Sequence, residues 1–196
     1  AVEVGIPRAI EVEDHTNFTI ALALHAGGMG IPFLPTKTLL GTGMMSGSSS
    51  FKEMECPLTR ERLALIPALK PDVAVLQAQR SDEEGNTHFW GGSGITKEAA
   101  LAARKVMVVV EEMVSKKVIR RDPNRTLLPG FLVHAVIQEP WGAHPSPVPG
   151  YYNRDHEQYI RYHRESRERD GYLKWLDRWV LGVKDRKEYL GLLSEE

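Results

Sequence analysis

The sequence predicts an α/β fold: an open, mainly parallel sheet flanked by helices, with a helical extension at the C-terminal end. Apolar runs at residues 73–76, 105–110 and 131–137 have the length of buried strands. A helical pattern lies between the first two, and such alternation is typical of parallel sheets. After residue 150 the chain is charged and helical in pattern. We therefore expect an α/β domain over residues 1–150 and a helical extension over residues 151–196, which packs on that domain or on a partner.

The elements of the first part follow from local signals. Residues 10–14 alternate like a short strand, and Thr16 is placed to cap a helix that the pair Gly27 and Gly28 would end. The prolines of residues 31–35 favour extended backbone. Residues 40–50 are rich in glycine and serine, so we expect a long mobile loop, a kind of segment that often carries function.

The next part contains the predicted sheet. We expect a strand and turn at residues 62–69, and Thr96 as the cap of a helix over residues 97–104. The central strand at residues 73–76 ends in polar side chains, and the second ends at Glu111 and Glu112. Ligands bind beyond the carboxyl ends of parallel strands. The polar residues at these ends are therefore candidate ligand contacts.

The C-terminal part is predicted to be helical. Residues 154–169 are polar on most faces, and residues 184–193 form a last short helix. Between them an apolar stripe recurs at helical spacing, which predicts packing against this chain or a partner. The stripe consists of Tyr172, Trp175, Leu176, Trp179 and Val180.

The stretch at residues 141–152 combines prolines and glycines with aromatic side chains. No helix or central strand can run through it, so it is predicted to be a stiff loop. Such a loop either lines a pocket or a subunit contact, or is a surface crossing held by its prolines. Its residues His144 and Ser146 are candidate ligand contacts.

Composition excludes several classes of protein. The chain has 196 residues, 42% hydrophobic and 26% charged, as in an ordinary globular protein. A net charge of −1 gives no electrostatic reason to bind nucleic acid or an anionic membrane. No apolar run reaches membrane-spanning length. The single Cys56 cannot form an internal disulfide, which favours the cytoplasm, and a buried structural thiol is favoured over a nucleophile.

Common catalytic and metal motifs are absent from the sequence. There is no phosphate loop, nucleophile elbow, dinucleotide fingerprint or HExxH pattern. His156 and His163 are better explained as a solvated helix face than as metal ligands, and we expect no metal. Glu111 and Glu112 are adjacent on a strand and point to opposite faces, so an acid–base pair and a structural role both stay open.

Four stretches carry a resemblance to a known family: residues 30–35 (GIPFLP), 67–74 (PALKPDVA), 79–86 (QRSDEEGN) and 141–145 (WGAHP). Over nearly its whole length the chain resembles the A (alpha) subunit of class I coenzyme A transferases of the glutaconate type. The resemblance implies a CoA-transferase A subunit that works with a B subunit, in an A2B2 heterotetramer, on acyl-CoA and a carboxylic acid. A glycine-rich front section of such subunits is expected to be missing here.

The resemblance also implies where the chemistry lies. The nucleophile of this branch is a glutamate of the B subunit in a Ser-Glu-Asn-Gly type motif, which this sequence lacks. We therefore expect no catalytic nucleophile on this chain, coenzyme A as a substrate, and an A subunit that shapes the acyl pocket. The substrate-binding candidates are Asn17, Phe33, Gln79, Arg80, Asn86, His144 and Ser146.

Structural roles stay open for these candidates. Gln79 and Arg80 could form an ordinary contact at the end of a strand, and Asn86 could have no role beyond forming a turn. The resemblance implies an acidic residue in ring-cleaving hydrolase relatives at the position of Asn17, which is an amide here. This weakens the argument for a hydrolase, although Glu13 and Asp14 are close in sequence. The alternatives are thus a CoA-thioester hydrolase or lyase on the same scaffold, a non-catalytic structural subunit, and a free-standing domain.

Overall fold

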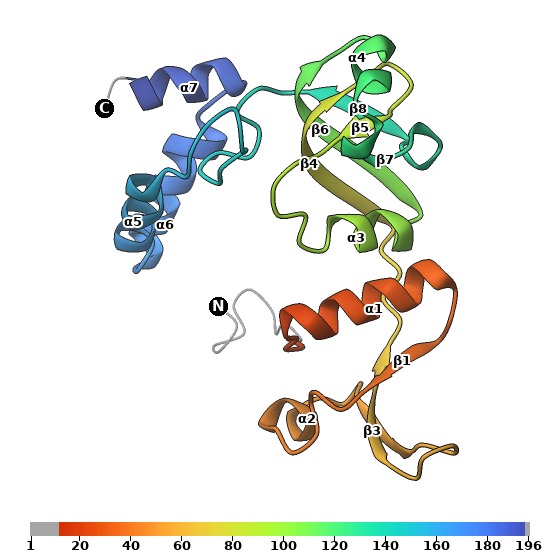
Figure 1. Cartoon of the computed structure of the whole chain (residues 1–196). Helices are drawn as coiled ribbons and strands as arrows, with labels where there is room; N and C mark the ends of the chain where they lie inside the picture. Colours follow the sequence, from red (N-terminus) through yellow and green to blue (C-terminus); the bar gives the residue numbers. More distant parts are fainter. Residues whose placement is uncertain (1–11, 195–196) are drawn as a thin grey trace. The chain divides into compact units, whose positions relative to one another are not determined.

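The computed structural model describes residues 12–194, which form two compact units. One contains residues 12–74 and 94–104, and the other contains residues 75–93 and 105–194. Strand β4 (Val73–Ser81) passes from the first unit into the second. Both units combine a sheet with helices, which confirms the predicted α/β class (Figure 1). The division at residue 150, between an α/β domain and a helical extension, stays a prediction.

The first unit is built on a three-stranded antiparallel sheet in the order β1-β3-β2. Leu34 pairs with Ile66, and Met54 pairs with Leu63. The buried core behind the sheet consists of Ala23, Leu39, Phe51, Ala64 and Ile66. The elements of this unit are α1 (Asn17–Met29), β1 (Phe33–Thr36), α2 (Gly43–Gly47), β2 (Lys52–Glu55), β3 (Arg62–Pro67) and α3 (Thr96–Ala102).

Helix α1 begins as predicted but ends later. The Thr16 side chain accepts a hydrogen bond from the Thr19 backbone N–H, and the Thr19 hydroxyl accepts one from the Thr16 backbone N–H. The helix continues through Gly27 and Gly28 and ends at Gly30, whose φ is 72°. A Cβ on Gly27 would lie 2.1 Å from the Leu69 carbonyl oxygen. The two glycines therefore allow close packing on neighbouring backbone, and the prediction that they end the helix is wrong.

Other local predictions for this unit are also corrected. Residues 43–47, predicted to lie in a mobile loop, form helix α2. The Thr42 side chain caps this helix by accepting a hydrogen bond from the Met45 backbone N–H. Helix α3 begins at Thr96 itself, with Ile95 at the cap position and no side-chain cap. The predicted strand at residues 10–14 falls partly outside the described residues, and residues 12–14 are irregular.

The second unit contains a five-stranded sheet in the order β7-β5-β4-β6-β8. Strands β6 and β8 are parallel, whereas β5 is antiparallel to both β4 and β7. Val106, Val108 and Val110 of β6 are fully buried, as predicted for the second strand. Val73 and Val75 of β4 are 45% and 64% exposed, so the prediction that the central strand is buried on both faces is wrong. The further elements are β5 (Thr87–His88), β6 (Lys105–Met113), α4 (Lys116–Arg121), β7 (Thr126–Leu128) and β8 (Ala135–Gln138), with 3-10 turns at Pro123–Arg125 and Gly130–Leu132.

The third predicted strand starts later than the apolar run does. Residues 131–132 belong to a 3-10 turn, and the strand begins at Ala135. The turn forms because Gly130 packs against the backbone of Glu84, where an added Cβ would lie 2.1 Å from the carbonyl oxygen. The Gly130 backbone N–H also donates to the Asn86 side chain at 2.9 Å.

The C-terminal part is helical, as predicted. It consists of α5 (His156–Glu165), α6 (Arg169–Leu176), a π-helical turn (Asp177–Leu181) and α7 (Arg186–Ser194). Of the predicted apolar stripe, Trp179 is buried, Trp175 and Leu176 are half-buried, and Tyr172 and Val180 are exposed.

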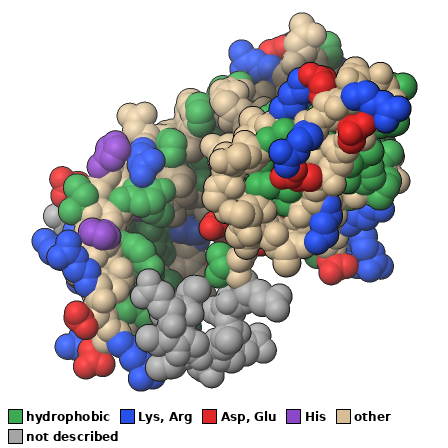
Figure 2. Space-filling view, turned by 90° about the horizontal axis from the view of Figure 1, so that it is seen from below, with side chains coloured by type: hydrophobic (Ala, Val, Ile, Leu, Met, Phe, Trp, Pro, Cys, Tyr) green, Lys and Arg blue, Asp and Glu red, His purple; other side chains and the backbone are tan. Residues whose placement is uncertain are grey.

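Basic and acidic side chains are interspersed on the face drawn in Figure 2, with hydrophobic side chains visible between them. None of the helices within residues 12–194 is long and apolar enough to cross a membrane. The mixture of charges in Figure 2 agrees with the small net charge of the chain.

Candidate functional site

The loop at residues 141–152, which we call the aromatic loop, is fixed by a buried carboxylate. Glu111 is 5% exposed and lies near the end of β6. Its two oxygens accept hydrogen bonds from the Gln77 amide at 2.7 Å, the Tyr152 hydroxyl at 2.9 Å and the Trp141 backbone N–H at 2.6 Å. A buried carboxylate with three donors is well compensated for its desolvation. The structure therefore supports a structural role for Glu111.

The backbone at the start of this loop is held in an uncommon conformation. Trp141 has a φ of 64°, which is rare for a bulky residue. Its ring stacks on Tyr152 at 4.4 Å with 5° between the planes. Gly142 follows, and a Cβ there would lie 2.9 Å from the Glu139 carbonyl oxygen and 3.1 Å from the Gln77 side chain. The loop thus depends on stacking, on Glu111 and on a residue without a side chain.

His144 joins the aromatic loop to the C-terminal helices. The residue is 8% exposed, and the His144–Pro145 peptide is cis. One ring nitrogen lies 3.1 Å from an Asp155 carboxylate oxygen, and the other lies 2.8 Å from the Tyr189 hydroxyl. Asp155 also caps α5 by accepting from the Gln158 backbone N–H. His144 therefore links the loop to both α5 and α7.

Burial is the main cause of the raised pKa values of the tyrosines around this loop. Burial, reinforced by a hydrogen bond to Glu112, raises the pKa of Tyr151 to about 12. Burial also raises the pKa values of Tyr152 and Tyr189. Burial acts to raise the pKa of Asp155 too, but the Gln158 N–H and His144 outweigh it, and the pKa of Asp155 is lowered. The tyrosines are therefore neutral donors at neutral pH.

A cavity of about 460 Å³ lies beside His144 and Pro145. Side chains of α5, α6, the π-helical turn and α7 complete its wall. Ser146 lies near it, because its hydroxyl is 2.6 Å from that of Tyr159, which lines the cavity. Of the alternatives that the sequence left open for this loop, a cavity is present beside it.

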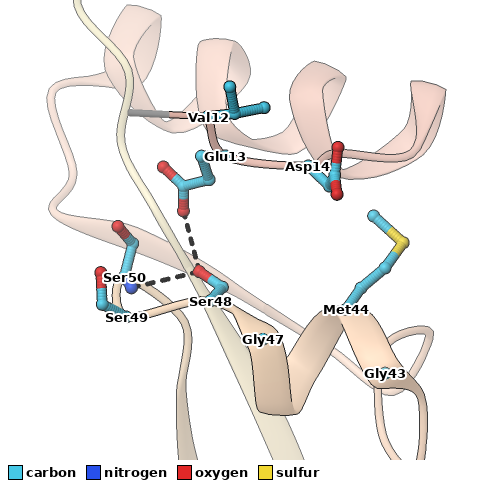
Figure 3. Close-up of a pocket in the computed structure, with 9 residues that line it drawn as sticks. All are labelled: Val12, Glu13, Asp14, Gly43, Met44, Gly47, Ser48, Ser49 and Ser50. Carbon is cyan, nitrogen blue, oxygen red and sulfur yellow. Dashed lines mark hydrogen bonds between the residues drawn. The ribbon is translucent and has the colours of Figure 1, made fainter. Parts of the chain in front are cut away.

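A second cavity, of about 690 Å³, lies in the first unit and is lined by polar residues (Figure 3). Glu13 and Asp14 precede α1, and Met44 and Gly47 come from α2. The Ser48 hydroxyl donates to a Glu13 carboxylate oxygen at 3.0 Å and accepts from the Ser50 backbone N–H at 3.1 Å. We call this the acidic cavity, because two carboxylates lie on its wall.

Three of the predicted binding residues form internal contacts in the second unit. Gln79 is 1% exposed, and its amide bonds to both the N–H and the carbonyl of Trp90. Arg80 donates to His88 at 3.2 Å and lies over the Trp90 ring. The Asn86 side chain donates a hydrogen bond to Asp82 and accepts one from the Gly130 backbone N–H. The Gln79 and Asn86 amides are thus engaged within the chain, and Arg80 is engaged through its Nε and the Trp90 ring.

The remaining two candidates lie in the first unit. Asn17 is exposed at the start of α1, and Phe33 is 38% exposed on β1. Neither lines the acidic cavity, although Asn17 is close in sequence to Asp14. Cys56, expected to be buried, is only half-buried. Among residues 12–194, no cluster of three or more His, Cys, Asp or Glu side chains could hold a metal ion.

Sequence reasoning did not predict which residues bond to one another to hold the aromatic loop. Gln77 and Tyr152 bond to Glu111 from 34 and 41 positions away. Tyr189 lies in a segment predicted only to be a short helix. No local pattern marks such partners, because they become neighbours only when strands and helices pack.

The comparisons with known proteins agree with this architecture. The family model described as coenzyme A transferase matches residues 5–139. The A subunit of the 3-oxoadipate CoA-transferase of Pseudomonas knackmussii is 37% identical over 195 residues, which cover 100% of this chain and 68% of that protein. This chain belongs to the coenzyme A transferase family. The resemblance seen in the sequence is thereby confirmed.

Two further comparisons concern the glutaconate branch of the coenzyme A transferases. The A subunit of the glutaconate CoA-transferase of Acidaminococcus fermentans is 31% identical over 201 residues, covering 94% of this chain and 63% of that protein. The crystal structure of glutaconate coenzyme A-transferase from the same organism matches with a TM-score of 0.85, over 92% of this chain and 62% of that one. The chain thus spans roughly two thirds of the length of these relatives.

Proposed function

We propose that this chain supplies the A-subunit part of a CoA-transferase that moves CoA between an acyl-CoA and a carboxylic acid. The observation that carries this proposal is the 37% identity, over the whole chain, to the A subunit of a known transferase. Relatives named for 3-oxoadipate and glutaconate favour an acid with two carboxyl groups as one substrate. The single cysteine favours work in the cytoplasm.

The proposed chemistry is covalent and uses a glutamate of a B subunit. That carboxylate attacks the acyl-CoA thioester, giving an acyl-glutamyl anhydride and CoA thiolate. The thiolate then attacks the glutamyl carbonyl, giving a glutamyl-CoA thioester and releasing the first acid. A second carboxylic acid reverses the sequence and leaves as the new acyl-CoA. Each step exchanges one acyl bond for another, so a difficult transfer is divided into easier ones.

The part of this chain in that reaction is to shape the pocket and hold the substrate. We propose that Asn17, Phe33, His144 and Ser146 contact substrate in the assembled enzyme, and that an A2B2 heterotetramer is the working form. We propose that Gln79, Arg80 and Asn86, whose side chains also bond within the chain, contact substrate as well. The sequence contains no Ser-Glu-Asn-Gly motif, which is consistent with a nucleophile on the partner.

The test begins with co-expression of this chain and the protein encoded beside its gene. The purified complex is incubated with succinyl-CoA or acetyl-CoA, with and without acetate or a dicarboxylic acid. Mass spectrometry is expected to find a CoA adduct on a glutamate of the partner, and new acyl-CoA only when an acceptor acid is present. Release of free CoA at the same rate without an acceptor would contradict transfer and support hydrolysis.

A purely structural role for this chain is distinguished by substitution. Replacement of His144 by Asn and of Ser146 by Ala is expected to raise KM for one substrate in the complex. The matched control is His156→Asn, an exposed histidine that does not line the cavity. Unchanged KM and unchanged turnover in all variants of the aromatic loop would show that the chemistry depends on the partner alone.

A further inference from the structure

The cavity beside His144 has walls that are aromatic and free of carboxylates. Six of its lining side chains carry aromatic rings: His144, Tyr159, Tyr162, Trp175, Trp179 and Tyr189. Cavities of this size, about 460 Å³, are large enough for a small organic molecule. None of the described lining residues is an aspartate or glutamate. The nearby Asp155 is engaged by His144 and by the cap of α5.

Arg186 gives this wall a positive charge. The side chain is half-buried and lines the cavity. Its guanidinium lies 4.7 Å from the centre of the Tyr189 ring and donates one long hydrogen bond, 3.4 Å, to the Gly142 carbonyl. It forms no ion pair with another residue in the described part of the chain. Stacking on a ring compensates only part of the cost of withdrawing such a cation from water.

The combination of walls and charge specifies a ligand class. Rings offer edge and face contacts to another ring, and one guanidinium can hold one carboxylate through two parallel hydrogen bonds. A cationic or strongly polar ligand would find no anionic partner on these walls. We propose that this cavity binds a small aromatic monocarboxylate, with its ring among the tryptophans and tyrosines and its carboxylate at Arg186. This is the cavity beside which His144 and Ser146 are proposed to contact substrate, but ligand binding to the chain alone can be measured without transferase turnover.

The experiment uses the full chain, 3-phenylpropanoate, and its uncharged amide, 3-phenylpropanamide. Binding is followed by NMR of the indole N–H groups, since two of the four tryptophans line the cavity and Trp90 does not. Millimolar acid is expected to shift the Trp175 and Trp179 signals and leave Trp90 unchanged. The amide is expected to bind about tenfold more weakly, because it loses the charge-assisted hydrogen bonds.

Variants test the role of the arginine. Arg186→Gln is expected to weaken binding of the acid about tenfold while leaving the affinity of the amide unchanged. Lys187→Gln removes an exposed charge from the same helix and is expected to bind like the parent chain. Absence of any Trp175 or Trp179 shift, or equal affinity for acid and amide, would overturn the proposal. The acid–amide comparison needs no substitution, so it decides the matter even if Arg186→Gln does not fold.

Discussion

Two glutamates of this chain illustrate two ways of placing a carboxylate. Glu111, which holds the aromatic loop, is buried and accepts hydrogen bonds from three different residues of the second unit. Glu13, on the wall of the acidic cavity, is exposed and accepts one hydrogen bond from Ser48 (Figure 3). The first is fully engaged by protein donors, and the second keeps most of its hydrogen-bonding capacity for solvent or a ligand. A conspicuous acidic residue is therefore not by itself a catalytic one.

Removal of the buried carboxylate should give the largest effect. Glu111→Ala leaves the Tyr152 hydroxyl, the Gln77 amide and the Trp141 N–H without their acceptor, so we expect a loss of about 3 kcal/mol in the free energy of unfolding. Urea denaturation measures this change in the free energy of unfolding. The control is Glu112→Ala, since Glu112 is exposed and holds the loop through one hydrogen bond from Tyr151. Equal losses in the two variants would contradict the role assigned to Glu111.

A side chain at Gly142 should give the next largest effect. Gly142→Ala forces a Cβ against the Glu139 carbonyl oxygen and the Gln77 side chain, and we expect a loss of about 1–3 kcal/mol in urea denaturation. Gly47→Ala in helix α2 is the matched change, because nothing lies within 4 Å of a Cβ there. That variant should be unchanged or slightly more stable. A loss at Gly47 as large as at Gly142 would show that the two regions are equally tightly packed.

The tyrosines of the aromatic loop should resist deprotonation. Folding raises the pKa of Tyr151 to about 12, against about 10 for an unfolded tyrosine. The associated stabilisation is therefore fully present below pH 10 and is lost as the pH rises through the folded value. Absorbance at 295 nm should show a late step in native protein that is absent in guanidinium chloride. Tyr151→Phe should reduce the size of this late step. A single step near pH 10 for all tyrosines would show that the pKa of Tyr151 is not raised by folding.

The smallest effect is expected at the exposed carboxylate. Glu13→Gln should change the free energy of unfolding by less than about 0.5 kcal/mol, because Glu13 is exposed and has a single side-chain partner. Under the proposed function the complex should also keep its transferase turnover, since the attacking carboxylate is expected on the B subunit. Turnover and denaturation measured on the same preparation separate the two effects. Complete loss of turnover with unchanged stability would instead place essential chemistry at Glu13.

Much of the local structure could be predicted from the sequence. The buried valines of β6, the Thr16 cap and the C-terminal helices follow from hydrophobic pattern and capping chemistry, which act over a few residues. The errors occurred where tertiary contacts override local preference. Gly27 and Gly28 continue a helix because neighbouring backbone approaches them, and residues 130–132 turn because Gly130 packs on Glu84.

The candidate site was less predictable than the fold. The stiff loop at residues 141–152 was recognisable from its prolines and glycines, and a cavity does lie beside His144. Which alternative holds for Gln79 was not recognisable, because an amide at a strand end looks the same whether it faces a ligand or a neighbouring backbone. A turn role for Asn86 was among the alternatives, and its side chain does bond to Asp82 within the turn. The substrate-binding roles of all seven candidates stay predictions.

The family, the α/β class and the available residue types could be inferred from short-range pattern and from the order of motifs along the chain. Which polar groups are engaged became clear only in the packed fold. Glu111 became a structural carboxylate and Arg186 a half-buried cation beside aromatic rings through contacts with residues up to 44 positions away. The physical reason is that burial and hydrogen-bond partners, which set the cost of a charge, arise only when distant elements pack together.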